Sequence, residues 1–341
     1  MQKRPNFFHH IHPPKISARE ARFTYTFGLG GLTLYFLLIL GLTGALELLY
    51  YVPSEEEANL SLQLINLFIP YGGLIRSIHF WAAQAMVITC ILHLLRIVFT
   101  GAYKPPRNFN WLIGIGLFIL TLFFDFTGYG LRWDSEIAWA LVVGTNLAKS
   151  IPLIGPGLYD LVVGSVAIGP PTIVRFYGWH IYGLPIFAVI LVSWHIFRVR
   201  RDGGISSSKE KAESPRRISR ADLIRREVLV AMIMTILLLI IATLFPPSLG
   251  AKANFENLPE DATAPWFFLW IQQLLRIGSP FLMGVLIPLI FILILALLPY
   301  VFDKSPKGVA IWFNREGRKV QWIVIIIAAC ILALTIKGAL L

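Results

Sequence analysis

Seven long apolar runs constrain the possible fold of this chain more than any other feature of its sequence. They lie near residues 27–50, 78–100, 111–130, 178–198, 224–245, 281–301 and 320–340. Each is close to the roughly 20 residues that a helix needs to cross a bilayer. Only 14% of the residues are charged, against about 25% in soluble domains. The sequence therefore excludes a soluble enzyme and predicts an all-α, multi-pass membrane protein with about seven transmembrane helices.

Basic residues are distributed unequally between the two sides of these spans. Of the 30 lysines and arginines, 23 lie in or beside the N-terminal segment, the second-to-third loop, the linker after the fourth span and the last loop, and 7 lie on the other side. Because loops rich in Lys and Arg stay in the cytoplasm, we expect a cytoplasmic N-terminus in a bacterial cytoplasmic (inner) membrane. The net charge of +11 then reflects topology, and no nucleic-acid partner is expected.

One polar linker divides the chain. The sequence GGISSSKEKAESPRR, residues 203–217, is typical of a flexible connection. We expect a four-helix bundle over residues 1–205, a cytoplasmic linker over 206–223 and a three-helix unit over 224–341. On the other side, the long stretch between Leu131 and Arg175 contains the amphipathic sequence IPLIGPGLYDLVVGS at 151–165, and we expect short helices along the membrane surface in this stretch.

Four histidines occur at two heights in two of the spans. His79 and His93 are 14 residues apart in the second span, and His180 and His195 are 15 apart in the fourth. Both spacings return to nearly the same helix face, roughly 21–22 Å further along. The two spans run in the same direction, so His79 can face His180 and His93 can face His195. A lone membrane histidine is more often an interhelical hydrogen bond, but two matched pairs favour two sites with bis-imidazole ligation, which suits haem b.

Four glycines have the same spacing. Gly30 and Gly44 in the first span, and Gly114 and Gly128 in the third, are each 14 apart, and we expect them to leave room for two flat macrocycles. Small residues also simply let membrane helices approach closely.

The segments that carry these residues resemble the cytochrome b family. They are GGLIRSIHFWAAQAMVITCILHLLRIVFTGAYKPPR, FTGYGLRWD and RFYGWHIYGLPIFAVILVSWHIFRVRRDGGIS. The 15-residue spacing is similar to the photosynthetic bf-type form, and the part after the linker resembles its subunit IV, here fused. The resemblance implies two haems b, an outer one on His79 and His180 and a cytoplasmic-side one on His93 and His195. It also implies a quinone substrate, a homodimer, and a Rieske-type iron–sulfur protein or a c-type cytochrome as outer-face partner.

The resemblance assigns roles to several basic residues. Arg76 and Arg96 match positions beside the haems, where a guanidinium would neutralise a propionate; simple interface anchoring is the alternative. Arg200, with Lys104 and Arg107, matches the cytoplasmic rim near the quinone-reducing site, or is only a topology signal.

The chain departs from the family at the quinol-oxidising pocket. The family's Pro-Glu-Trp-Tyr motif reads Ala264-Pro265-Trp266-Phe267 here, so both the acid and the phenol are missing. Asp125 lies within the third span, and an intramembrane carboxylate is a functional candidate by default. We predict Asp125 as the substitute proton acceptor beside Pro265, Trp266 and Phe267; a carboxylate that pairs with a neighbouring helix or snorkels is the alternative.

Two further departures affect cofactors and charge. Gly28 stands where the bf-type protein has the cysteine that anchors an extra c-type haem, so no covalent haem is expected. The usual Leu-Pro-Trp after the third span reads Leu131-Arg132-Trp133, which adds a charge at the pocket mouth, and Phe80 replaces an arginine that commonly follows the first ligand.

Three functions remain open from the sequence. The first is the dihaem cytochrome b subunit of a respiratory or photosynthetic quinol:electron-acceptor oxidoreductase, inactive alone, that carries electrons between quinone sites and outer-face partners. The second keeps both haems as a transmembrane relay without outer quinol oxidation. The third, a haem-free transporter or scaffold with structural histidines, ranks last because it does not require the matched glycine pairs.

Overall fold

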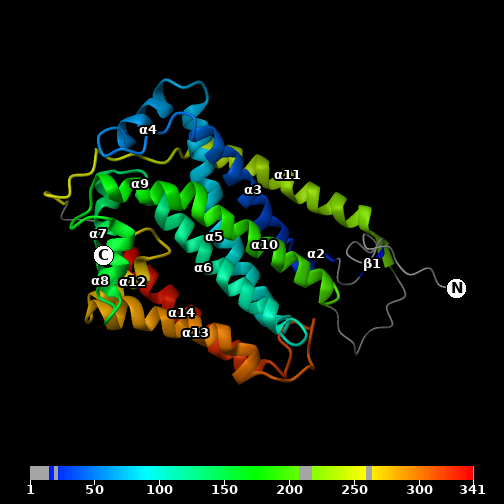
Figure 1. The fold of residues 1–341 in the computed structure, drawn as a ribbon. Coiled ribbons are helices and arrows are strands. Elements are labelled where there is room, and N and C mark those ends of the chain that lie inside the picture. Colours follow the sequence, from blue (N-terminus) through cyan, green and yellow to red (C-terminus); the bar gives the residue numbers. More distant parts are fainter. Residues whose placement is uncertain (1–14, 19–21, 207–216, 259–262, 341) are drawn as a thin grey trace.

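The computed structural model describes residues 15–18, 22–206, 217–258 and 263–340 (Figure 1). Most of the linker, residues 207–216, and most of the basic N-terminal segment counted above lie outside the described residues. Within the described part, seven helices are long and apolar enough to cross a membrane. The first three are α3 (Leu29–Glu47), α5 (Gly72–Phe99) and α6 (Asn108–Gly130). The fourth consists of α9 (Pro170–Gly178), η1 (Trp179–Gly183) and α10 (Leu184–Arg201), and the fifth is α11 (Arg220–Leu244). The sixth consists of η3 (Pro280–Leu286), α13 (Ile287–Leu297) and η4 (Leu298–Phe302), and the seventh is α14 (Arg318–Leu340). The predicted all-α architecture with seven spans is confirmed.

The second and fourth spans begin earlier than predicted, at Gly72 and Pro170. The second span was predicted to begin near residue 78, after Arg76, a charged residue that interrupts the apolar run. Arg76 is buried, however, and its guanidinium donates to the Asn66 side chain and to the Pro247 carbonyl. The fourth span begins at two prolines, which suit the first turn of a helix because no N–H is needed there.

Short helices cover one end of the bundle. They are α4 (Ala58–Leu67), α7 (Ser135–Lys149), α8 (Gly155–Val163) and α12 (Leu269–Leu275). The surface pattern predicted α7 and α8, and both form; α4 and α12 were not predicted. We call this end, which also contains His79, the outer end, and the opposite end the inner end, after the predicted orientation. The inner end carries α2 (Phe23–Thr26) and the antiparallel pair β1 (Lys15–Ser17) and β2 (Arg217–Ser219).

The first four spans form two tightly packed pairs, α3 with α5 and α6 with α10. The spans after the linker lie on two sides of them. Helix α11 packs against α5 and α3, whereas α13 packs against α6 and α14 against α5. Figure 1 shows α11 along the upper edge and α13 with α14 along the lower edge. The C-terminal part therefore packs against the four-helix part on two sides.

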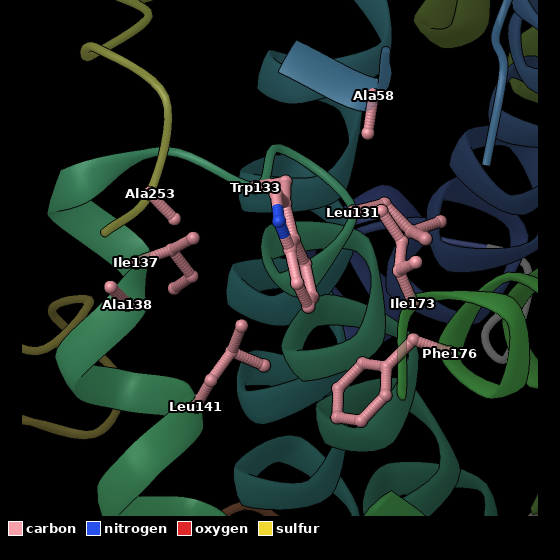
Figure 2. Packing of buried hydrophobic residues seen from close by; sticks show 9 residues of the cluster. All are labelled: Ala58, Leu131, Trp133, Ile137, Ala138, Leu141, Ile173, Phe176 and Ala253. Atoms are coloured by element: carbon pink, nitrogen blue, oxygen red, sulfur yellow. The ribbon is translucent and has the colours of Figure 1, made fainter. Parts of the chain in front are cut away.

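An apolar core joins the short helices to the bundle at the outer end (Figure 2). Trp133, Ile137 and Leu141 are at most 3% exposed and pack with residues from distant segments, including Ala253 after α11. The Ala253 amide donates to the Trp133 carbonyl, and the Ser135 amide donates to the Ala251 carbonyl. This core holds the segment after α11 against the end of α6.

A buried ion pair closes the inner end. Lys104 Nζ lies 3.0 Å from Asp303 Oδ2, with side-chain exposures of 0% and 4%. Lys104 also donates to the Lys307 carbonyl, and the Tyr103 hydroxyl donates to Asp303. The Lys104 ammonium, which the resemblance associates with the quinone-reducing rim, is thus occupied by a contact between the α5–α6 loop and the last loop.

Candidate functional site

The structure brings His79 and His180 together at the outer end. Their ring centroids are 6.4 Å apart, with 62° between the ring planes. His79 projects from α5 and His180 from η1 (Trp179–Gly183), and both rings are half-buried. Since a metal–imidazole nitrogen bond is about 2 Å long, two rings that share one metal have centroids about 6 Å apart. The spacing therefore fits a pair of axial ligands.

Two threonines orient these imidazoles. Thr43 Oγ1 lies 2.9 Å from His79 Nδ1, and Thr127 Oγ1 lies 3.0 Å from His180 Nδ1. Each hydroxyl donates its own hydrogen to a carbonyl one turn earlier, at 2.8 Å, so its oxygen accepts from the imidazole. The proton therefore sits on Nδ1, and Nε2 keeps the lone pair that a metal requires.

A π-helical turn explains the 15-residue spacing in the fourth span. In a regular α-helix, 15 residues end about 60° beyond a whole number of turns, whereas 14 end about 40° short. The residues from Trp179 to Gly183 form a π-helical turn, which takes up one extra residue. His180 and His195 consequently share a face as His79 and His93 do on the regular helix α5.

The inner pair has different surroundings. His93 lies on α5 and His195 on α10, within electrostatic range of each other. His195 Nδ1 is buried and has no side-chain hydrogen-bond partner among the described residues, and the polar group that acts on this ring is the backbone of Asn110. The inner imidazoles are thus brought together without the threonine contacts of the outer pair.

Each of the four predicted glycines faces one histidine. A Cβ added at Gly44 would lie 3.2 Å from Cε1 of His79, and one at Gly128 would lie 2.9 Å from Cε1 of His180. The corresponding distances are 3.1 Å between Gly30 and His93 and 3.6 Å between Gly114 and His195. The glycines were expected to leave room for two flat macrocycles. This expectation needs refinement, because the space beside each glycine is filled by an imidazole of a neighbouring helix.

The predicted arginines are placed differently from one another. Arg76 donates to Asn66 and Pro247. Arg96 donates from Nε to the Tyr25 carbonyl. Its Nη2 and the Nε of Arg200 are buried and have no partner among the residues that the structure describes. Arg96 and Arg200 therefore keep donors for an anionic or carbonyl group at the inner end, whereas two of the Arg76 donors serve the protein fold.

These observations together test the fit of haem b. Two imidazoles stand at an axial-ligand distance, their tautomer leaves Nε2 free, and glycines make room for the rings at both heights. At the inner end, Arg96 has a buried donor suited to a propionate. The residues present fit the group.

A polar chain runs from the loop before α12 into the bundle. Trp266 Nε1 donates to Gln84 Oε1 at 2.8 Å, and Gln84 Nε2 donates to the Tyr129 hydroxyl at 3.4 Å. Asp125 lies one helical turn before Tyr129 and is 4% exposed, and neither of its carboxylate oxygens has a partner within the described part of the chain. The alternative interpretation, an Asp125 carboxylate paired with a neighbouring helix, is therefore not observed.

The remaining predicted pocket residues surround the same tyrosine. The Phe267 ring is 5.9 Å from the Tyr129 ring in an edge contact, and Phe267 is buried. Trp266 is 38% exposed, and the Pro265 carbonyl accepts from the Phe268 amide. Asp125, Trp266 and Phe267 are thus near Tyr129, and Pro265 begins the turn that places them.

Sequence reasoning missed Thr43, Thr127, Gln84 and Tyr129. A signal for the threonines was present, because each directly precedes an outer glycine: Thr43-Gly44 and Thr127-Gly128. The inner glycines follow Leu29 and Ile113 instead. Gln84 carries no comparable signal, since its role depends on a loop 182 residues away.

The fold and the site define a seven-span membrane protein with two histidine pairs, one toward the outer end and one toward the inner end of the helix bundle. The family model for cytochrome b(N-terminal)/b6/petB matches residues 84–252, and the model for cytochrome b(C-terminal)/b6/petD matches residues 252–341. The chain is 39% identical over 175 residues to cytochrome b6 of Prochlorothrix hollandica, which covers 51% of this chain and 79% of that protein. A solved structure, a hyperthermophilic respiratory complex III, matches with a TM-score of 0.79 and 25% identity, over 92% of this chain and 84% of that one.

The chain belongs to the cytochrome b family, as a bf/bc-type cytochrome b fused to a subunit IV-like part. It is a multi-pass membrane cytochrome b of quinol oxidoreductase electron transfer and a subunit of such a complex. The family implies haem b.

Proposed function

We propose that the chain is a dihaem subunit that carries electrons between quinone sites and outer-face redox partners. His79 and His180 ligate the outer haem, and His93 and His195 the inner one. The observation that carries this proposal is the 6.4 Å separation of the His79 and His180 rings, with both tautomers set by threonine. A haem b held by these imidazoles would supply one-electron transfer.

The protein residues would orient the ligands and bind the haem carboxylates. Thr43 and Thr127 keep the outer Nε2 atoms available. Arg96 holds a propionate at the inner end with its unpaired Nη2, and Arg200 binds a quinone oxygen at the inner rim. The four glycines let the helices approach with the imidazoles between them.

We infer that Asp125 accepts a proton from quinol at the outer end, beside Pro265, Trp266 and Phe267. Support comes from its buried, unpartnered carboxylate next to Tyr129. A buried acid without partners is costly, and such groups are typical of proton-transfer sites in membranes. It would replace the carboxylate that the sequence lacks at Pro265.

The assembly and topology follow the same proposal. Residues 1–205 form the haem-binding unit, 206–223 the linker and 224–341 the subunit IV-like unit. The N-terminus lies in the cytoplasm of a bacterial cell, the chain forms a homodimer, and its outer partner is a Rieske-type iron–sulfur protein or a c-type cytochrome. No covalent haem is expected, since Gly28 cannot form a thioether.

A reduced-minus-oxidised spectrum and a haem-to-chain ratio of the purified protein test the dihaem proposal. We expect two haems b per chain, and one in each of His180→Ala and His195→Ala. A chain without haem would instead support the transporter or scaffold function.

Quinol reduction of the outer haem tests the second part. In the purified complex, quinol should reduce this haem in a manner blocked by an outer-site inhibitor, and Asp125→Asn should abolish the reaction. If only the inner haem responds, the chain is a transmembrane relay. The proline at position 265, where the family has its acid, is the observation that favours this second candidate.

A further inference from the structure

Glu47 is a carboxylate at the outer end of the first span, and the proposed function does not use it. It is the last residue of α3, and its Oε1 is buried and has no partner among the described residues. The C-terminal end of a helix carries partial negative charge, which disfavours a carboxylate there. Ionisable residues within membrane spans are costly and are functional candidates by default. Because the local energetics of α3 do not account for Glu47, its role depends on groups of other helices.

Glu47 lies one helical turn beyond the residues of α3 that face His79. Thr43, whose Oγ1 is 2.9 Å from His79 Nδ1, precedes Glu47 by four residues. Gly44, which faces His79 Cε1, precedes it by three. Residues three and four apart are neighbours on a helix surface. The Glu47 carboxylate is accordingly within electrostatic range of His79, on the side nearer the outer end.

Arg76 supplies the opposite charge. It lies one turn before His79 on α5, and Glu47 acts on it electrostatically. The two side chains do not form a direct ion pair in the described structure, since two of the Arg76 donors serve other groups. Arg132 and Asp134 also act on Arg76, but these two are paired with each other. Glu47 is thus available to balance the Arg76 charge beside His79.

The inner end has a matching arginine without a matching carboxylate. Arg96 follows His93 by three residues toward the inner end, as Arg76 precedes His79 by three toward the outer end. The side chains that act on Arg96 among the described residues are Tyr25 and Arg107. Neither of them carries a carboxylate, so the positive charge beside the inner pair is not balanced in the same way.

The residue of α3 that corresponds to Glu47 also differs at the inner end. Glu47 follows Gly44 by three residues toward the outer end, and Phe27 precedes Gly30 by three toward the inner end. An aromatic side chain adds no charge there. The two histidine pairs therefore share their glycines and arginines, but a carboxylate one turn away accompanies the outer pair alone.

Charge beside a haem changes its midpoint potential. The oxidised iron carries one more positive charge than the reduced iron, so a nearby carboxylate stabilises the oxidised form and a nearby arginine the reduced form. Charges interact more strongly in the protein interior than in water. A carboxylate beside one of two similar sites therefore lowers the midpoint potential of that site.

We propose that the Glu47 carboxylate lowers the midpoint potential of the haem held by His79 and His180 by balancing the positive charge of Arg76. This inference rests on the proposed function, since it requires a haem at the outer pair. It makes the outer haem the stronger reductant of the two. Electrons consequently pass from the outer haem to the inner one.

Redox titration of the purified complex, followed by haem absorbance, tests this role. The complexes with His180→Ala and His195→Ala identify which transition belongs to which haem. In Glu47→Gln, which removes the charge with little change in size, we expect a higher midpoint potential for the outer haem and an unchanged one for the inner haem. Glu47→Ala removes the charge without any requirement for space and should raise the outer potential too.

Two further variants separate charge from packing. Glu47→Asp keeps the carboxylate and should retain most of the low potential that Glu47→Gln loses. Glu56→Gln is the matched control, because it removes an exposed carboxylate from the segment before α4 at the same end, and it should leave both potentials unchanged. Haem content is measured in every variant, so that each potential refers to an occupied outer pair.

The outcomes distinguish this inference from the proposed function. If the wild-type complex holds no haem at the outer pair, the proposed function and the role of Glu47 both fail. If that haem is present and neither neutral variant differs from Glu56→Gln in the outer potential, only the role of Glu47 is overturned. An equal rise in Glu47→Asp and Glu47→Gln indicates a packing effect and overturns it as well.

Discussion

The outer and inner ends of the bundle hold equivalent histidine pairs in different chemical surroundings. At the outer end, both Nδ1 atoms meet a threonine hydroxyl, and an apolar core joins the surrounding segments. At the inner end, His195 Nδ1 has no threonine partner among the described residues, and a buried ion pair between Lys104 and Asp303 joins the loops. At the outer end, threonine hydroxyls contact the imidazole rings directly. At the inner end, the polar contact is an ion pair between loops.

This difference indicates how one helical repeat can produce two unlike redox sites. A hydrogen bond to Nδ1–H makes an imidazole a stronger electron donor to its metal. We therefore expect a haem held by the outer pair to have a lower midpoint potential than one held by the inner pair. The following variants are designed to break or sharpen the comparison.

The largest effect is expected for Lys104→Met at the inner end. Removing one partner of a buried ion pair leaves an uncompensated charge and costs about 3–5 kcal/mol. Chemical unfolding in detergent should show this loss relative to Lys337→Met, which alters an exposed lysine. Lys104→Met combined with Asp303→Leu should recover much of the stability, and equal stabilities of Lys104→Met and Lys337→Met would contradict a structural role.

Alanine substitutions of two glycines compare the ligand packing of the two ends. In Gly128→Ala, the new Cβ would lie 2.9 Å from His180 Cε1 and must displace the ring, while in Gly114→Ala the distance of 3.6 Å to His195 is an ordinary contact. Overpacking of this kind costs about 1–3 kcal/mol. Haem content should therefore fall at the outer site in Gly128→Ala and stay unchanged in Gly114→Ala; a similar loss in both variants would argue against the observed ring positions.

Replacing the two outer threonines with valine should make the surroundings of the outer histidine pair resemble those of the inner histidine pair. Loss of such a hydrogen bond usually weakens metal binding about 10–100-fold. In Thr43→Val and Thr127→Val we expect faster loss of the outer haem and a higher midpoint potential for it, measured by redox titration. Thr33→Val is the control, because Thr33 forms hydrogen bonds with Leu29 and Thr89. An unchanged midpoint potential of the outer haem in both test variants would contradict this interpretation.

The smallest effect concerns pH and one tyrosine at each end. Burial raises the pKa of Tyr103, and the neighbouring Asp303 raises it further; burial and Tyr177 raise the pKa of Tyr51. Because the folded pKa is raised, each contribution to stability is present below the unfolded pKa of about 10 and is lost as the pH rises above it. The free energy of unfolding should fall above pH 10 with a slope that Tyr103→Phe and Tyr51→Phe each reduce, and identical slopes in wild type and variants would refute it.

Much of the fold could be predicted because membrane insertion imposes simple rules on sequence. The seven spans follow from length and hydropathy, and the structure confirms them. The second and fourth spans start earlier than predicted. Placing Arg76 and Pro170 inside these spans requires knowledge of the tertiary structure. The pairing of His79 with His180 followed from helical spacing, and the structure brings these rings together.

The functional site was less predictable where contacts join distant segments. Gln84 receives a hydrogen bond from Trp266, and Arg76 is engaged by Asn66 and Pro247. No local pattern contains such partners. The roles of the haem ligands and of Asp125 remain predictions that the proposed experiments test.

The sequence by itself determined the number of spans, the two histidine pairs and the glycines opposite them, because helical periodicity and hydrophobicity act locally. Only the tertiary structure decided that a π-helical turn aligns His180 with His195, that threonines orient the outer imidazoles, and that Glu47 comes within electrostatic range of His79 and Arg76. These features depend on where separate helices meet. Their physical basis is the need to pair buried polar groups with whatever lies within hydrogen-bonding distance, and packing between spans sets that distance.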